Sequence, residues 1–224
     1  MSRKNKTTIG IVLTAILCCA GMAVVDGMLH LSYGTKSLVK LVLFLLLPFI
    51  LSIIDRSVSI RGMFHFRGKG ILKPLGLGAG LYGLILGAYF VAARFYDFSG
   101  IVDSLQADVG VDRENFVYVA IYISFLNSLL EEYFFRGFVF VNLKSVCPRW
   151  FAYVFSSVLF AVYHVAMMDG WFNLPIFLLV MAGLTAGGMI FCRLNEKLGT
   201  IHVSWFVHMF ANFAINTIGF ILMR

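Results

Sequence analysis

Three charged side chains interrupt one long apolar stretch of this chain. The stretch runs over 116–130 and ends in the adjacent carboxylates Glu131 and Glu132; Arg136 follows before apolar residues resume at 137–141. A charge near the centre of a lipid span costs about 2.5 to 3.5 kcal/mol on insertion scales, and such charges usually mark functional sites. We therefore expect chemistry at residues 131–137.

Two histidines and an asparagine lie in two other apolar runs. His164 closes the sequence Phe-Ala-Val-Tyr-His, and His208 is followed four residues later by Asn212. Because residues four apart are neighbours on a helix surface, His208 and Asn212 are predicted to share one face. With Glu131, these side chains are predicted to form a polar centre in an apolar body.

The chemistry open to this set is hydrolysis by an activated water. A desolvated glutamate can act as a general base, and with a histidine beside it such a glutamate can deprotonate a water and later pass the proton to a leaving amine. A second histidine and an asparagine one turn apart, such as His208 and Asn212, offer hydrogen-bond donors for a developing oxyanion. No G-x-S-x-G elbow or serine–lysine pair is evident, which favours amide hydrolysis without a covalent intermediate.

Zinc is an alternative way to activate the water. Glu131, His164 and His208 would make a ligand set of two histidines and a glutamate, with an open position for water. The sequence contains no H-E-x-x-H pattern, and the residues alone leave both mechanisms open.

The two neighbouring glutamates are predicted to differ in role. Glu132 and Arg136 are four residues apart and are expected to neutralise each other. That pairing would leave Glu131 uncompensated, about 100° away round the same helix. A buried carboxylate without compensation is too costly to keep for packing alone, which favours a functional role for Glu131.

The composition places the chain in a lipid bilayer. Of its 224 residues, 60% are hydrophobic and 13% are charged, whereas soluble domains have roughly 45–50% and 25%. The net charge of +7 comes without a zinc-finger, helix-turn-helix or basic-aromatic pattern, so nucleic acid is not expected as a partner.

Apolar runs of the length of a membrane span predict an all-α, polytopic helical bundle. Seven are found, at about 8–30, 37–54, 74–94, 115–141, 150–168, 172–192 and 201–222. An eighth, shorter span would reverse the side on which the chain ends. The third run is rich in glycine, which allows close helix approach. We expect one membrane-embedded domain over 1–224, with the catalytic motifs in 127–212.

The distribution of basic residues predicts a cytoplasmic N-terminus, because cytoplasmic loops carry an excess of Lys and Arg. With that orientation the inside segments hold Arg3, Lys4, Lys6, Arg56, Arg61, Arg67, Lys69, Lys73, Lys144, Arg149, Arg193 and Lys197. The outside segments hold only Lys36, Arg94, Arg113 and Arg224.

The order of these motifs resembles the CPBP family of CAAX proteases and bacteriocin-processing proteins, also called Abi. The family pattern is Glu-Glu-x-x-x-Arg, then Phe-x-x-x-His, then His-x-x-x-Asn, each in a separate span. The chain matches it without substitution at 131–136, 160–164 and 208–212. The resemblance covers about the last 95 residues, and the first 110 resemble the family only in being membrane spans.

The resemblance implies an intramembrane endopeptidase related to the type II CAAX prenyl endopeptidases. By that analogy Glu131 and His164 activate water, His208 and Asn212 form the oxyanion pocket, and Glu132 and Arg136 support them. A glutamate mechanism without metal fits this set better than zinc, so no cofactor is expected. The implied partners are the bilayer and a membrane-associated protein or peptide substrate. The compact chain is more similar to bacterial members, which implies the bacterial plasma membrane; no oligomeric state is implied.

Two other functions compete with the protease. A catalytically silent scaffold or bacteriocin-immunity protein would act by binding a partner, but it has no need for Glu131, His164, His208 and Asn212 together. A proton-coupled transporter could use intramembrane Glu and His. Transporters usually show internal repeats and broken helices, and no corresponding halves are found.

Overall fold

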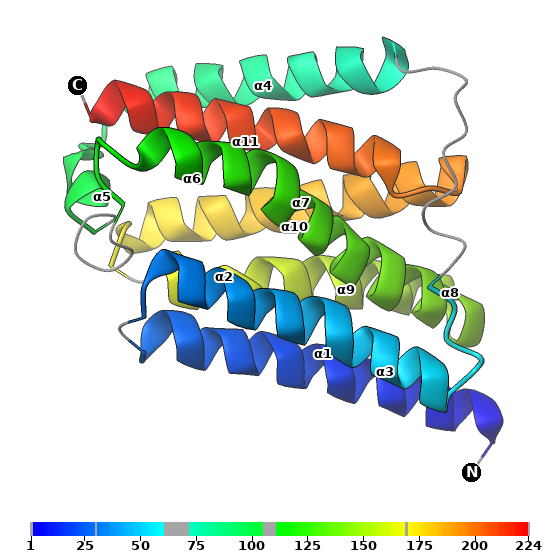
Figure 1. Ribbon diagram of the computed structural model, residues 1–224. Coiled ribbons are helices and arrows are strands. Elements are labelled where there is room, and N and C mark those ends of the chain that lie inside the picture. The colour runs from blue at the N-terminus through cyan, green and yellow to red at the C-terminus, as the bar shows by residue number, and fades with distance from the viewer. Residues whose placement is uncertain (1, 30, 61–71, 105–110, 169, 224) are drawn as a thin grey trace. The chain divides into compact units, whose positions relative to one another are not determined.

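The computed structural model describes residues 2–29, 31–60, 72–104, 111–168 and 170–223 (Figure 1). These residues form helices joined by turns and loops, and no strand occurs among them. The predicted all-α class and polytopic helical architecture are confirmed. Of the basic residues used to orient the chain, Arg61, Arg67, Lys69 and Arg224 lie outside the described residues, and the orientation stays a prediction.

The chain divides into two compact units, which are described one at a time. Unit 1 comprises 1–65 and 130–201, and unit 2 comprises 66–129 and 202–224. The helix α7 (Ser128–Glu131) contains the boundary between 129 and 130. That the whole chain acts as one membrane-embedded domain stays a prediction.

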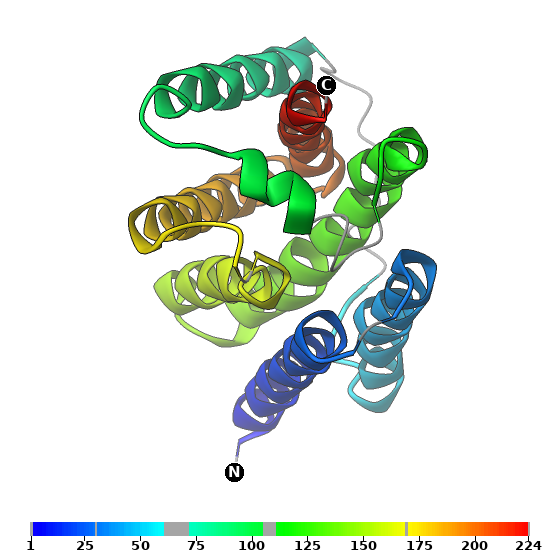
Figure 2. The same cartoon turned by 90° about the vertical axis from the view of Figure 1, so that its left-hand side faces the viewer.

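Unit 1 contains the Glu-Glu-x-x-x-Arg motif, His164 and the helices around them. They are α1 (Arg3–Gly27), α2 (Tyr33–Leu41), the π-helix η1 (Val42–Leu46), α3 (Leu47–Ile54), the π-helix η5 (Glu132–Val141), α8 (Asn142–Val146), α9 (Arg149–Tyr163), the short 3-10 helix η6 (Ala166–Met168) and α10 (Leu174–Leu198). The segment Tyr33–Ile54 is helical throughout. It lies beside α1, as Figure 2 shows.

Local sequence explains where these helices begin and end. Helix α1 starts at Arg3, ahead of the predicted residue 8, because the Ser2 hydroxyl accepts a hydrogen bond from the Asn5 amide. Helix α10 continues to Leu198, beyond the predicted residue 192. It ends there because Gly199 adopts the left-handed conformation, with φ of 67°, that closes many helices.

Aromatic side chains form the core of unit 1. Phe44 of η1 stacks on Phe134 with ring centroids 4.1 Å apart, and it meets Phe135 and Tyr163 at 5.6 and 5.3 Å. Phe135 in turn lies against Phe160 of α9 at 5.2 Å. These rings join the second, fourth and fifth predicted spans and bring their polar residues close together.

Unit 2 contains α4 (Leu72–Ala92), α5 (Ser99–Ser104), α6 (Phe116–Tyr122), the π-helix η4 (Ile123–Asn127) and α11 (His202–Leu222). Helix α11 packs along α4 and against α6 and η4. A Cβ on Gly78 would lie 2.5 Å from the Phe210 ring, so the glycine is needed at that contact. The predicted close approach of the third run is therefore made at Gly78.

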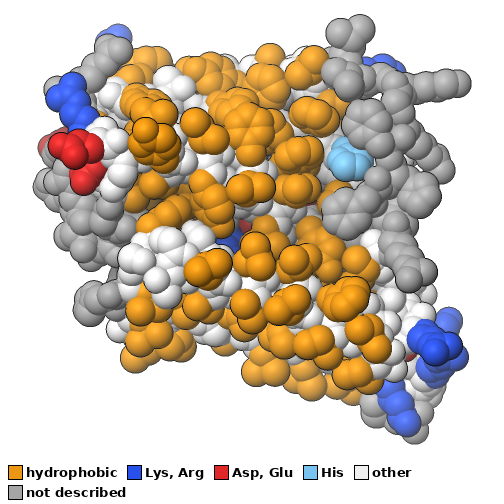
Figure 3. All heavy atoms as spheres, in the orientation of Figure 1, with side chains coloured by type: hydrophobic (Ala, Val, Ile, Leu, Met, Phe, Trp, Pro, Cys, Tyr) orange, Lys and Arg blue, Asp and Glu red, His pale blue; other side chains and the backbone are white. Residues whose placement is uncertain are grey.

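Six helical segments among the described residues are long and apolar enough to cross a membrane. They are Arg3–Gly27, Tyr33–Ile54, Lys73–Ala92, Arg149–Met168, Leu174–Leu198 and His202–Leu222. The remaining predicted span, 115–141, is helical from 116 to 146, but its polar residues lower its hydropathy. Hydrophobic side chains cover much of the face drawn in Figure 3, and many large hydrophobic residues are exposed, as lipid contact requires. The chain is an integral membrane protein.

Candidate active site

Glu131 lies at the end of α7 and is paired with a lysine from another helix. The Lys40 Nζ atom donates a hydrogen bond to Glu131 Oε1 at 2.5 Å. Both residues are buried, with 2% of Glu131 and 5% of Lys40 exposed. The prediction that Glu131 would lack a compensating charge is wrong, because Lys40 in α2 supplies one.

Two aromatic rings surround the Lys40 ammonium group. Nζ lies 4.8 Å from the ring centroid of Tyr163 and 5.5 Å from that of Phe44. Aromatic faces attract a cation, more strongly when water is excluded. Lys40 is thus held between aromatic faces and a carboxylate, and this arrangement fixes the position of Glu131.

Sequence reasoning missed Lys40, although a signal was present. The residue lies inside the second predicted run, 37–54. A charge within an apolar span indicates a functional site at Lys40 as much as at Glu131.

Glu132 is paired with Arg136, the partner predicted for it. Arg136 Nη1 lies 3.1 Å from Glu132 Oε1, and both side chains are fully buried. The Arg136 guanidinium also lies 4.1 Å from the ring of Phe160 and 5.0 Å from that of Phe191. The i,i+4 pairing is confirmed, and the aromatic rings provide the rest of the environment of this buried cation.

The Glu-Glu-x-x-x-Arg motif lies where the helix changes from α-helical to π-helical hydrogen bonding. Helix α7 ends at Glu131, and the π-helix η5 begins at Glu132. Each residue of η5 from Glu132 to Phe140 is buried. Short π-helical segments within α-helices are rare and frequently occur at functional sites.

His164 lies at the C-terminal end of α9 and is half-buried. Its Nδ1 atom lies 2.7 Å from the Phe160 carbonyl oxygen. Because a carbonyl can only accept, Nδ1 carries the hydrogen, and in the neutral ring Nε2 carries the lone pair. Phe160 is thereby both a packing residue and, through its backbone, the residue that sets the His164 tautomer.

One aromatic ring connects the surroundings of Glu131 and His164. The Tyr163 ring contacts the Lys40 ammonium group, and it meets the His164 ring at 4.9 Å, edge to face. Within unit 1 the structure therefore places the Lys40–Glu131 pair and His164 around Tyr163.

His208 and Asn212 occupy one face of α11 in unit 2, as predicted, and both are buried. The Asn212 Nδ2 atom donates to the Ile123 carbonyl of η4 at 3.0 Å. An amide nitrogen carries two hydrogens, so this bond orients the Asn212 side chain and uses one of its two N–H donors.

Two further residues of α11 hold it against the α6–η4 segment. Asn216 Nδ2 donates to the Ala120 carbonyl at 3.2 Å and to the Ser124 hydroxyl at 3.0 Å. Trp205 Nε1 donates to the Phe125 carbonyl at 3.0 Å. Asn216 continues the four-residue spacing of His208 and Asn212, and this repetition could have identified it from sequence.

The four predicted catalytic residues are divided between the units. Glu131 and His164 belong to unit 1, with Glu132 and Arg136, whereas His208 and Asn212 belong to unit 2. Their catalytic roles stay predictions.

The surroundings of Glu131 bear on the zinc alternative. Within neither unit do the described residues include a group of three or more His, Cys, Asp or Glu side chains that could hold a metal ion. The Glu131 carboxylate faces the Lys40 ammonium group instead, and a cation at that distance opposes binding of a second one. These surroundings do not fit a zinc ligand.

Comparison with protein families gives one match. The model of the family described as "Type II CAAX prenyl endopeptidase Rce1-like" matches residues 113–214. Comparison with curated proteins and with solved structures finds no match. The matched segment contains all three motifs, at 131–136, 160–164 and 208–212. The family predicted from the motifs is therefore confirmed for residues 113–214, which form an Rce1-like type II CAAX prenyl endopeptidase domain of the CPBP family.

Proposed function

We propose that this protein is an intramembrane endopeptidase that cleaves a peptide bond of a membrane-associated protein or peptide. The observation that carries the proposal is the Glu131 carboxylate. It is buried on a helix within the matched segment and is paired with Lys40, which lies outside that segment. A buried ion pair contributes little net stability compared with apolar packing. The presence of this ion pair is therefore better explained by a chemical role of Glu131.

Glu131 is the proposed general base. It takes a proton from a water molecule, with the Nε2 lone pair of His164 as hydrogen-bond partner, and the water oxygen bonds to the scissile carbonyl carbon. The carbon–nitrogen bond then breaks, and the proton held by Glu131 passes to the leaving amine. The products are a carboxylic acid and an amine, and general acid–base catalysis of this kind contributes about 10²- to 10⁴-fold.

His208 and Asn212 are the proposed donors to the oxyanion of the tetrahedral intermediate. Asn212 is suited to this role because its hydrogen bond to Ile123 fixes the amide and uses only one of the two N–H groups. A donor fixed in advance needs no reorganisation when the negative charge develops.

Lys40 is a proposed positioning residue. Its ammonium group donates a hydrogen bond to Oε1 of Glu131 and thereby fixes the position of that carboxylate. Glu132 and Arg136 have a supporting role: their pair, enclosed by Phe160 and Phe191, anchors η5 next to Glu131.

The deciding experiment compares the membrane proteins and released peptides of cells producing the unmodified chain, Glu131→Gln or Glu114→Gln at equal amounts. Glu114 is an exposed carboxylate, so its variant controls for the chemical change itself. We expect a cleaved species with the unmodified chain and Glu114→Gln that is lost with Glu131→Gln. A cellular phenotype that persists in Glu131→Gln without any such species would instead identify a scaffold or immunity protein.

A further inference from the structure

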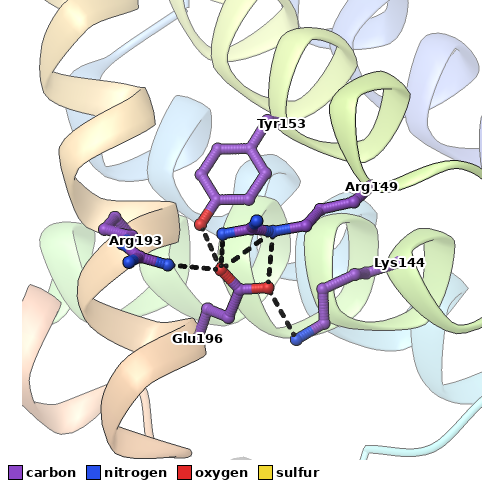
Figure 4. A network of polar contacts seen from close by, with 5 residues as sticks. All are labelled: Lys144, Arg149, Tyr153, Arg193 and Glu196. Carbon is purple, nitrogen blue, oxygen red and sulfur yellow. Dashed lines mark hydrogen bonds and ion pairs between the residues drawn. The ribbon is translucent and has the colours of Figure 1, made fainter.

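Three basic side chains from three helices of unit 1 converge on one carboxylate (Figure 4). Arg149 donates to Glu196 through Nε at 3.0 Å and Nη2 at 2.6 Å. Lys144 Nζ and Arg193 Nη1 lie 3.4 and 3.1 Å from the same carboxylate. The Tyr153 hydroxyl donates to it at 2.6 Å. We call these five residues the Glu196 cluster.

The Glu196 cluster holds more positive charge than its carboxylate can balance. Three cations and one carboxylate leave two positive charges in excess. A single arginine bound through two N–H groups would be enough to neutralise Glu196. Gathering two more cations around it adds repulsion between like charges, and a further anion at this place would relieve that repulsion.

The cations of the cluster are accessible to such an anion. The side chains of Arg149 and Arg193 are 59% and 50% exposed, whereas that of Glu196 is only 16% exposed. A guanidinium group has five N–H donors. Arg193 presents one nitrogen to Glu196 and Arg149 presents two. The planar guanidinium group matches the geometry of phosphate oxygens.

The cluster lies at the end of two candidate membrane spans. Arg149 is the first residue of α9, and Glu196 lies in the last turn of α10. Trp150, next to Arg149, is 67% exposed, and exposed tryptophan is typical of the membrane–water interface. The cluster is therefore at the level where lipid phosphates lie.

We propose that the Glu196 cluster binds the phosphate of an anionic phospholipid. The excess charge selects an anion, the arginines suit phosphate, and the interfacial position favours a lipid over a soluble ligand. The predicted orientation places the cluster on the cytoplasmic side, where anionic lipids attract basic segments next to a span. This inference does not depend on the proposed peptidase activity.

The test measures lipid binding to the full chain in detergent by native mass spectrometry, with phosphatidylglycerol and phosphatidylcholine of the same acyl chains. We expect the unmodified protein to bind phosphatidylglycerol preferentially. Arg149→Gln/Arg193→Gln should lower that affinity about 25-fold, or about fivefold for each charge removed. The single variant Arg193→Gln is measured as well, in case the double variant is poorly folded.

The matched control is Lys4→Gln/Lys6→Gln, which removes two exposed charges on the same predicted side of the membrane. It should retain the preference for phosphatidylglycerol. Equal binding of the two lipids by the unmodified protein would overturn the proposal, as would equal loss in the control and cluster variants. Competition by inorganic phosphate as effective as by phosphatidylglycerol would also overturn it, because the site would then bind free phosphate.

Discussion

Lys40 and Glu131 form a buried ion pair that joins α2 to α7, with Nζ and Oε1 2.5 Å apart. Lys40 lies outside the segment 113–214 that matches the family model, and Glu131 lies inside it. The first part of the chain therefore contributes directly to the surroundings of the proposed general base.

Replacing Lys40 by methionine tests the positioning role. Lys40→Met removes the positive charge beside a buried carboxylate, and breaking such a pair costs about 3 to 5 kcal/mol of stability. We expect a lower melting temperature in detergent. In the fraction that stays folded we expect a kcat about 100-fold lower, because small displacements of a reacting group are costly.

Two further variants separate positioning from folding. Lys40→Met/Glu131→Gln removes both charges and should melt at a higher temperature than Lys40→Met, since two buried neutral groups replace an uncompensated charge. It should stay inactive. Lys40→Arg keeps the charge and should recover part of kcat with little change in KM. Full activity of folded Lys40→Met would refute the positioning role.

Arg136 is expected to contribute more to stability than an exposed arginine does. Arg136→Met removes the cation that pairs with fully buried Glu132 and lies against Phe160. We expect a loss of about 3 kcal/mol or more. The control is Arg94→Met, at an exposed position, where a change within about 0.5 kcal/mol is expected. Similar denaturation midpoints for the two variants would contradict this.

The helices and the motifs could be predicted because both are properties of nearby residues. Apolar runs define the spans, and the four-residue spacing predicts the Glu132–Arg136 pair, which the structure confirms. Lys40 and Glu131 are 91 residues apart, and no local spacing connects them. The Glu196 cluster could not be predicted for the same physical reason: Lys144 and Arg149 are 52 and 47 residues from Glu196, and no local spacing connects them.

The junction between α1 and the end of α3 should be sensitive to acid. The Thr7 hydroxyl donates to Asp55 Oδ2 at 2.6 Å, and the Ser57 amide donates to Oδ1 at 2.9 Å. These hydrogen bonds, that from Thr7 first, lower the pKa of Asp55 below its ordinary value. The resulting stabilisation is complete above the ordinary pKa and is lost as pH falls through the lowered one.

Thr7→Val removes the hydrogen bond that lowers the pKa of Asp55 most, at nearly constant side-chain volume. We expect Thr7→Val to lower the melting temperature at neutral pH and to leave it nearly unchanged at pH values below the lowered pKa. Thr8→Val, at the next position, is the control, because the Thr8 hydroxyl donates to the Lys4 carbonyl rather than to a carboxylate. A deficit of Thr7→Val that does not vary with pH would contradict the assignment to Asp55.

Asn212 and Asn216 allow the oxyanion role to be separated from helix packing. Both are buried on α11, and both donate to carbonyls of the α6–η4 segment. Loss of one oxyanion donor lowers kcat by about 10²- to 10³-fold. We expect Asn212→Ala to show that loss and Asn216→Ala to keep the kcat of the folded fraction, while both lower the melting temperature. Hydrolysis by each purified variant, normalised to folded protein, measures the difference. Equal kcat for the two would mean that Asn212 only holds the helices together, and the oxyanion would then require another donor.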